Sequence, residues 1–178
     1  MIEEPLFKYY LPRGEFYDTL TDSNGSIIWQ TPWQPNLIVN GLRNVLAALV
    51  KGEGQPLKFW AVGTGREAWD NQPPGDSLNA ERLQLTQLYR ETKRKLILAD
   101  KITFVGSTPS SPSNQLQIRI DFVAADIPTI GDRQLREFGL ISGGSDDPNT
   151  GFLINHRIHP RIDLQEGFTL QRTLRLTF

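Results

Sequence analysis

The stretch that decides the fold is the last one in the chain, and it reads Phe168-Thr169-Leu170-Gln171-Arg172-Thr173-Leu174-Arg175-Leu176-Thr177-Phe178. Successive side chains of a strand point to opposite faces, so the even positions form one face and the odd positions the other. The even face is nearly all apolar, and the odd face is polar. An isolated strand does not recover the entropy lost in ordering its backbone. We therefore expect these residues to form a strand whose apolar face packs in the core.

The composition excludes several classes of function. The chain has 178 residues, the size of one domain, and its 19 basic and 20 acidic residues give a net charge of -1. Without a global positive charge, we expect no nucleic-acid partner. The absence of cysteine excludes disulfides, thiol catalysis and cysteine-ligated metal sites. The sequence shows neither a signal peptide nor an apolar stretch long enough to cross a bilayer, so we expect no Sec-dependent secretion and no direct membrane insertion.

The first part of the chain predicts a hairpin. Two short aromatic and β-branched runs, at residues 15–20 and 26–30, flank a turn that contains Asn24-Gly25. This pair adopts positive φ at little cost, as a hairpin connection requires. We expect a single domain over residues 1–178, with residues 1–35 as an N-terminal hairpin arm and residues 36–178 as the core.

One helix is predicted, at residues 37–51. Asn36 is a good N-cap, and Lys51-Gly52 is a suitable end. The apolar residues recur at the three- and four-residue spacing of one helical face, and they are Ile38, Leu42, Val45, Leu46 and Leu49. We expect this face to pack on a sheet.

Several strands are predicted downstream of the helix. Residues 57–62 are apolar on both faces apart from Lys58, which is typical of a central strand. A short helical piece is expected within residues 78–89. Further strands are predicted at residues 102–104, 116–122, 135–141 and 152–158. The expected fold class is α+β and mostly antiparallel β, a β-sandwich-like domain with one core helix packed on the sheet.

The sequence shows no catalytic constellation. His156 and His159 lie three residues apart on a predicted strand, where their side chains point to opposite faces, so we expect no shared metal. Two histidines and no cysteine leave few bases for a nucleophilic triad, and no Gly-x-Ser-x-Gly motif is present. The one basic cluster, Lys93-Arg94-Lys95, is interpreted as a solvated strand entrance or a contact with an acidic partner. We expect no enzyme, no metal and no cofactor, while carboxylates that only the fold brings together stay open as an alternative.

Aromatic and proline-rich segments supply the candidate contact residues. Aromatic side chains and arginine contribute most of the energy of protein interfaces. The predicted interface residues are Trp29, Trp33, Trp69, Asn71, Gln72, Pro73, Pro74 and Gly75. In the alternative interpretation, the tryptophans stack on sugar rings, as in a carbohydrate-binding β-sandwich module. A glycan is therefore left open as a further partner.

Several short motifs resemble structural proteins of phage tails and phage tail-like contractile particles. Upstream, the motifs are Asn36-Leu37-Ile38-Val39-Asn40-Gly41, which opens the predicted helix, and Trp60-Ala61-Val62-Gly63-Thr64-Gly65. Downstream, they are Arg136-Glu137-Phe138-Gly139-Leu140-Ile141, Thr150-Gly151-Phe152-Leu153-Ile154-Asn155-His156 and the closing strand. The resemblance spans residues 36–178.

The resemblance implies a non-enzymatic structural subunit at the baseplate, collar or fibre attachment region of such a particle. Its implied partners are copies of itself and other tail or baseplate subunits. The implied location is the virion or a tail-like particle assembled in the cytoplasm. Ile141 stands where the family often has an aromatic residue, and no repetitive shaft follows, so a compact baseplate or collar component is favoured over a receptor-binding fibre tip.

Overall fold

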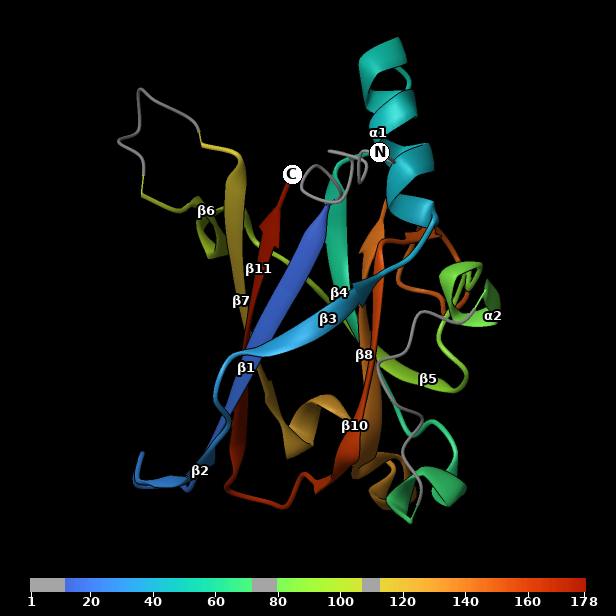
Figure 1. The fold of residues 1–178 in the computed structure, drawn as a ribbon. Coiled ribbons are helices and arrows are strands. Elements are labelled where there is room, and N and C mark those ends of the chain that lie inside the picture. Colours follow the sequence, from blue (N-terminus) through green and yellow to red (C-terminus); the bar gives the residue numbers. More distant parts are fainter. Residues whose placement is uncertain (1–11, 72–79, 107–112) are drawn as a thin grey trace, which may run out of the picture.

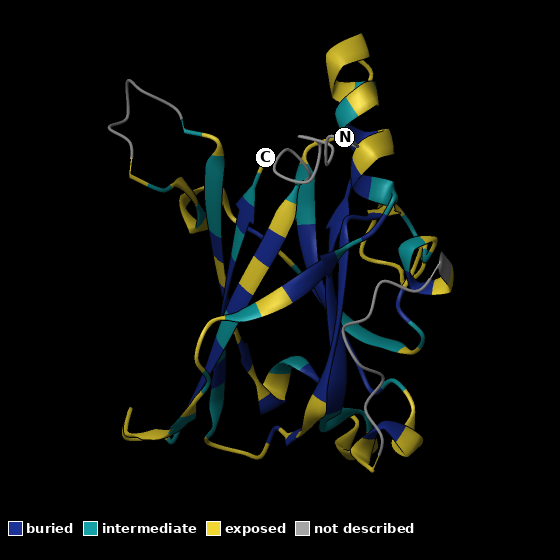
Figure 2. Ribbon diagram, viewed as in Figure 1, coloured by how far each residue is buried: buried dark blue, intermediate teal, exposed yellow. Residues whose placement is uncertain are grey.

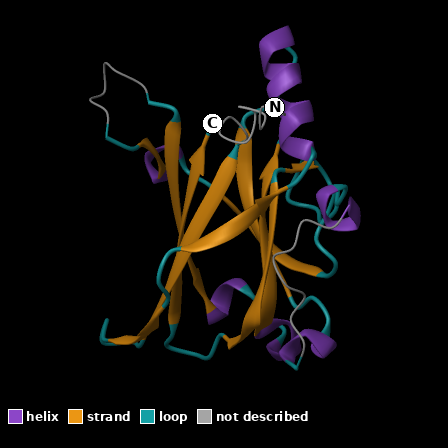
Figure 3. Ribbon diagram, viewed as in Figure 1, coloured by secondary structure: helices purple, strands orange, loops and turns teal. Residues whose placement is uncertain are grey.

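The computed structural model describes residues 12–71, 80–106 and 113–178. The chain is mostly antiparallel β, and its strands form one curled sheet with a single substantial helix (Figures 1 and 3). The strands are β1 (Arg13–Thr21), β2 (Ile27–Gln30), β3 (Gln34–Ile38), β4 (Leu57–Gly63), β5 (Glu91–Leu96), β6 (Ile102–Phe104), β7 (Gln115–Val123), β8 (Gln134–Ser142), β9 (Phe152–Leu153), β10 (Asn155–Asp163) and β11 (Thr169–Thr177). The helices are α1 (Gly41–Lys51) and the short α2 (Ala80–Leu83).

The expected β-sandwich is wrong, because one short strand joins what would be its two layers. The strand order is β5-β4-β8-β10-β3-β1-β11-β7-β6, with β2 added to β1 and β9 added to β8. On one side β3 pairs with β1 at Gly14↔Asn36, and on the other it pairs with β10 at Asn155↔Ile38. The sheet is therefore continuous and curls into a half-barrel.

Lys95 bridges the opening that remains on the other side of the half-barrel. Its Nζ lies 2.9 Å from the Asp121 carbonyl oxygen and 2.8 Å from Asp126 Oδ2, so it connects β5 to the end of β7. The chain itself also crosses this gap, because residues 97–101 lead directly from β5 to β6. Both margins of the sheet are thereby held near each other.

The prediction for the last strand is confirmed. β11 lies between β1 and β7, and it pairs with both over its whole length, from Thr169 to Thr177. Leu170 and Leu174 have no exposed surface. The closing stretch therefore lies in the middle of one half of the sheet.

The predicted hairpin is confirmed, but its first strand is not an arm. β1 and β2 pair at Leu20↔Trp29, and Gly25 in the turn has a φ of 80°. β1 also lies inside the sheet between β3 and β11, and its Phe16 is buried in the core. Of the expected arm, residues 1–11 lie outside the described part of the chain.

The helix ends where predicted but begins four residues later than expected. Asn40 is the N-cap, and residues 34–38 form β3 because they pair with two neighbouring strands. At the end, Gly52 has a φ of 82°, and its N–H lies against the carbonyls of the last turn. Leu42 and Val45 are buried, whereas Leu49 is 47% exposed, so only the first turns of the predicted apolar face pack on the body. The end of α1 projects away from the sheet (Figure 1).

The core fills the inside of the curl (Figure 2). It includes Phe16, Trp60, Ile118, Phe122 and Phe138 from four strands. The predicted strand at residues 57–62 is confirmed as β4, which lies between β5 and β8. The predicted short helix is confirmed as α2, and the other predicted strands correspond to β6, β7, β8 and the pair β9 and β10. No helix in the described residues has the length and apolar character needed to cross a membrane.

Candidate functional site

The apolar interior of the curl contains a cluster of charged side chains. Asp18 on β1 lies directly opposite Arg172 on β11, and Asp18 Oδ2 is 3.1 Å from Arg172 Nη2. Arg172 Nη2 also lies 2.8 Å from His159 Nε2 of β10, and its guanidinium is 4.4 Å from the ring centre of Phe138. All three ionisable groups are buried. We call Asp18, His159 and Arg172 the interior cluster.

The hydrogen bonds of His159 determine which of its nitrogens carries the proton. Arg172 can only donate, so His159 Nε2 must accept, and His159 Nδ1 then donates to the Pro160 carbonyl oxygen at 2.8 Å. Burial and the positive charge of Arg172 lower the pKa of His159 well below its ordinary value. The imidazole is therefore neutral at physiological pH, and both of its nitrogens are occupied.

The pKa of Asp18 moves in the opposite direction. Burial raises it above the ordinary value, and the charges of Arg172 and Arg157 oppose this rise. Asp18 Oδ1 accepts no hydrogen bond from the described residues. Buried oxygens of this kind are uncommon in folded proteins, because an acceptor without a donor costs about 1–3 kcal/mol.

We expect the neutral His159 to make stability depend on pH. Below about pH 6.5 the unfolded chain protonates this histidine and the folded chain does not. The free energy of unfolding therefore decreases as the pH is lowered below this value. The facing charges are Arg172 and Arg157, with His156 nearby. The expected slope is at most about 1.4 kcal/mol per pH unit, and it should be lost in His159→Asn, whose amide can accept and donate. Urea unfolding at several pH values measures it.

Comparison of wild type with His159→Asn separates the contribution of His159 to the pH dependence of stability from that of Asp18. The raised pKa of Asp18 produces the opposite slope above pH 3.8, but Asp18 is present in both proteins. The difference between the two curves therefore reports the histidine. Equal slopes for wild type and His159→Asn would contradict the assignment of a neutral, buried imidazole.

The second histidine belongs to a different cluster. His156 Nε2 lies 2.9 Å from Glu137 Oε2, and the carboxylate also accepts the backbone N–H groups of Tyr89 at 3.1 Å and Arg90 at 2.7 Å. Glu137 and His156 have no exposed surface. This arrangement fastens the segment before β5 onto β8, which is a structural role.

Within the described residues, no group of three or more His, Cys, Asp or Glu side chains is arranged to hold a metal ion.

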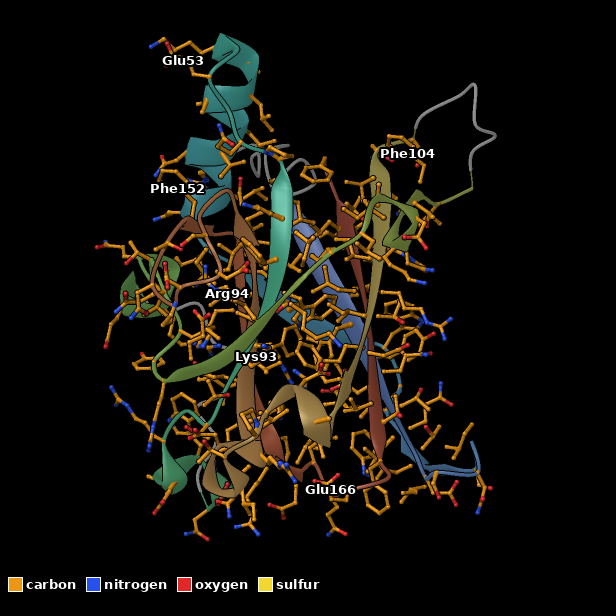
Figure 4. The ribbon with its side chains drawn as sticks, turned by 180° about the vertical axis from the view of Figure 1, so that it is seen from behind. Glu53, Lys93, Arg94, Phe104, Phe152 and Glu166 are labelled. Atoms are coloured by element: carbon orange, nitrogen blue, oxygen red, sulfur yellow. The ribbon has the colours of Figure 1, made fainter. Side chains whose placement is uncertain are left out.

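The basic cluster of β5 is largely neutralised within the chain. Arg94 is buried and pairs with Glu91 at 2.5 Å, and its Nη1 donates to the carbonyls of Ser145 and Thr150. Lys95 bridges to Asp126 as described above. Lys93 lies on the same edge strand (Figure 4). The cluster thus anchors the 143–151 loop and closes the curl.

Five of the exposed apolar side chains lie at the end of the half-barrel from which α1 projects. We call this the helix-end surface, and its members are Leu49, Val50, Phe104, Phe152 and Phe178. Val50 on α1 is 92% exposed, and Phe152 on β9 is 55% exposed. Figure 4 shows Phe104 and Phe152 at the end from which α1 projects, whereas Glu166 lies at the opposite end.

The structure separates the predicted contact residues from one another. Trp33 is 40% exposed, and it packs against Tyr17 and the Arg175 guanidinium. Trp29 is half-buried beside the interior cluster. Trp69 is only 6% exposed and packs on Tyr89, so it is a core residue and does not present a contact face. Asn71 is exposed. The remaining predicted loop residues, Gln72, Pro73, Pro74 and Gly75, lie outside the described part of the chain.

Sequence reasoning missed the interior cluster, although the sequence contains a signal for it. Arg172 is the one charged residue on the apolar face of the last strand, and Asp18 stands between Phe16 and Leu20 on the inward face of β1. A lone charge on an apolar face requires a buried partner. Which two strands would pair, and therefore which charges would meet, depends on the fold.

No family model, curated protein or solved structure matches the chain.

Proposed function

We propose that this chain is a non-enzymatic structural subunit of a phage tail or tail-like contractile particle, at the baseplate, collar or fibre attachment region. The observation that carries the proposal is the helix-end surface. Large exposed apolar patches mark sites of association in soluble proteins, and five exposed apolar side chains lie at this end of the molecule. The short motifs that resemble phage-tail structural proteins indicate the kind of assembly.

The end of α1 is the most exposed part of this surface. An isolated helix of this length is marginal in water and needs packing for its stability. Leu42 and Val45 supply that packing for the first turns, but Leu49 and Val50 in the last turn remain exposed. A neighbouring subunit that covers them would stabilise the helix and bury apolar surface. Copies of this chain are the proposed occupants, together with other tail or baseplate subunits.

The strands at the two ends of the sheet order, β5 and β6, are poorly suited to association by strand addition. β5 carries Lys93 and Lys95, and β6 has only three residues. Charged and short edge strands discourage pairing with another sheet. Association through the helix-end surface is therefore favoured over extension of the sheet.

Charge at the helix tip is expected to prevent self-association. Val50→Glu and Leu49→Glu each place a carboxylate in the proposed contact, where its desolvation opposes assembly. Wild-type chain should form oligomers whose mass rises with concentration in sedimentation velocity, whereas both variants should remain monomeric. Asn44→Glu, on an exposed position of the same helix, is the matched control and should associate like wild type. Equal association of all four proteins would overturn the assignment of this surface.

A further inference from the structure

A second feature lies at the opposite end of the molecule from the helix-end surface. A cavity of about 420 Å³ is lined by β1, β2, the start of β3, β10 and the segment before β11. Some of its lining residues are buried, including Asp18 and His159, and others are exposed, including Asp163 and Gln165. The cavity therefore opens to solvent above the interior cluster.

The polar groups of the cavity require a ligand that both donates and accepts. Asp18 Oδ1, without a donor among the described residues, needs a group that brings a hydrogen. Thr31 Oγ1 accepts the N–H of Asp18, so its own hydroxyl hydrogen can be donated. Gln34 Oε1 accepts from Arg157 Nη2, which leaves the Gln34 amide hydrogens for donation. A hydroxyl group satisfies both demands.

The net charge around the cavity disfavours a cation, and the Asp18 carboxylate disfavours an anion beside its free oxygen. Arg172 and Arg157 outnumber Asp18 near the floor, and His159 is neutral, so a cation would meet net positive charge. A carboxylate would bring no hydrogen to Asp18 and would face it as a like charge. At the rim, Arg161 and Asp163 pair with each other at 2.9 Å. A neutral ligand is therefore favoured.

The walls of the cavity add an apolar component. Trp29, Phe168, Leu20 and Ile162 line it, and Trp29 is only half-buried. A large aromatic ring next to hydrogen-bonding groups suits a ligand that has one apolar face and a polar perimeter. We propose that this cavity binds a neutral, hydroxyl-bearing ring of monosaccharide size, with Asp18 accepting from a ligand hydroxyl and Trp29 covering its C–H face.

This proposal goes beyond the assembly role, and it does not depend on it. Binding uses residues of one chain only, at the end opposite the helix-end surface. Failure of ligand binding would therefore leave the assembly proposal intact, and a monomeric chain could still bind the ligand.

Saturation-transfer NMR on the full chain tests the proposal. The neutral probes are D-glucose, D-galactose and myo-inositol at about 10 mM, a concentration suited to millimolar affinity. Glucosamine and glucuronate are the cationic and anionic counterparts. We expect saturation transfer to the ring protons of at least one neutral probe, and weaker transfer to its charged counterparts.

Two variants locate the binding site. Gln165→Trp fills the mouth of the cavity from an exposed position, and Trp29→Ala removes the stacking ring. Each should weaken binding by about three- to tenfold or more. Trp33→Ala, outside the cavity lining, is the matched control and should bind like wild type. Transfer to no neutral probe, stronger transfer to a charged one, or undiminished binding in Gln165→Trp would overturn the proposal.

Discussion

Arg172→Met is expected to lower the free energy of unfolding by about 3–5 kcal/mol, because it leaves the Asp18 carboxylate buried without its cation. The methionine also removes the donor to His159 Nε2. Both losses occur inside the curl, where Asp18 and His159 are buried. Urea unfolding monitored by circular dichroism measures the effect.

The same substitution three positions away supplies a matched control. Arg175 is three residues further along β11, on its opposite face, where it contacts Trp33 and Gln117. Arg175→Met should cost less than about 1 kcal/mol. The double variant Asp18→Leu with Arg172→Met should recover more than half of the single loss, since both charges are gone. A loss below about 1 kcal/mol for Arg172→Met would refute the coupling of this pair.

Glu137→Ala should destabilise the chain by a similar amount, about 3–5 kcal/mol. The substitution removes the acceptor of two backbone N–H groups and of His156, and each buried donor left alone costs about 1–3 kcal/mol. The segment before β5 should loosen first, which hydrogen exchange at Tyr89 and Arg90 can detect. Increased exchange there is the signature that separates this effect from a general loss of stability.

Glu166→Ala is the control for Glu137→Ala. Glu166 forms an ion pair with Arg133 at 2.6 Å, and its side chain is 75% exposed. Exposed ion pairs contribute less than about 1 kcal/mol. If both glutamate variants changed stability equally, the buried role assigned to Glu137 would be wrong.

The sequence predicts the strands well because the spacing of apolar side chains within a strand depends only on that strand. The alternation in residues 168–178 is the period of a strand, and the apolar run at 57–62 is that of a strand covered on both faces. Both strands are present as β11 and β4. Gly52 also ends α1 as predicted, since positive φ is a property of that one residue.

Features that depend on distant pairing were not predictable in this way. Ile38 fits the apolar face of the helix, yet it lies in β3, because backbone pairing with two strands outweighs the helical period. That same strand converts the expected sandwich into a curled sheet. A strand of five residues that joins two layers leaves no compositional trace.

In the candidate site, too, the exposure of a side chain depends on parts of the chain that are distant in sequence. The chemistry of tryptophan alone predicts it as a contact residue, but Trp69 lies in the core because Tyr89 and the close approach of Gly65 cover it. The helix-end surface arises because α1 projects beyond the sheet, which its periodicity does not reveal. Exposed Val50 has the same sequence character as buried Val45.

The most direct test of the structural role is the recovery of this chain in large particles. Particles pelleted from the source culture by ultracentrifugation would be analysed by quantitative mass spectrometry. The account predicts that the chain sediments with tube and sheath proteins at a fixed ratio, in several copies per particle. A chain that stays entirely in the supernatant, in a culture whose pellet contains intact tail-like particles, would contradict it.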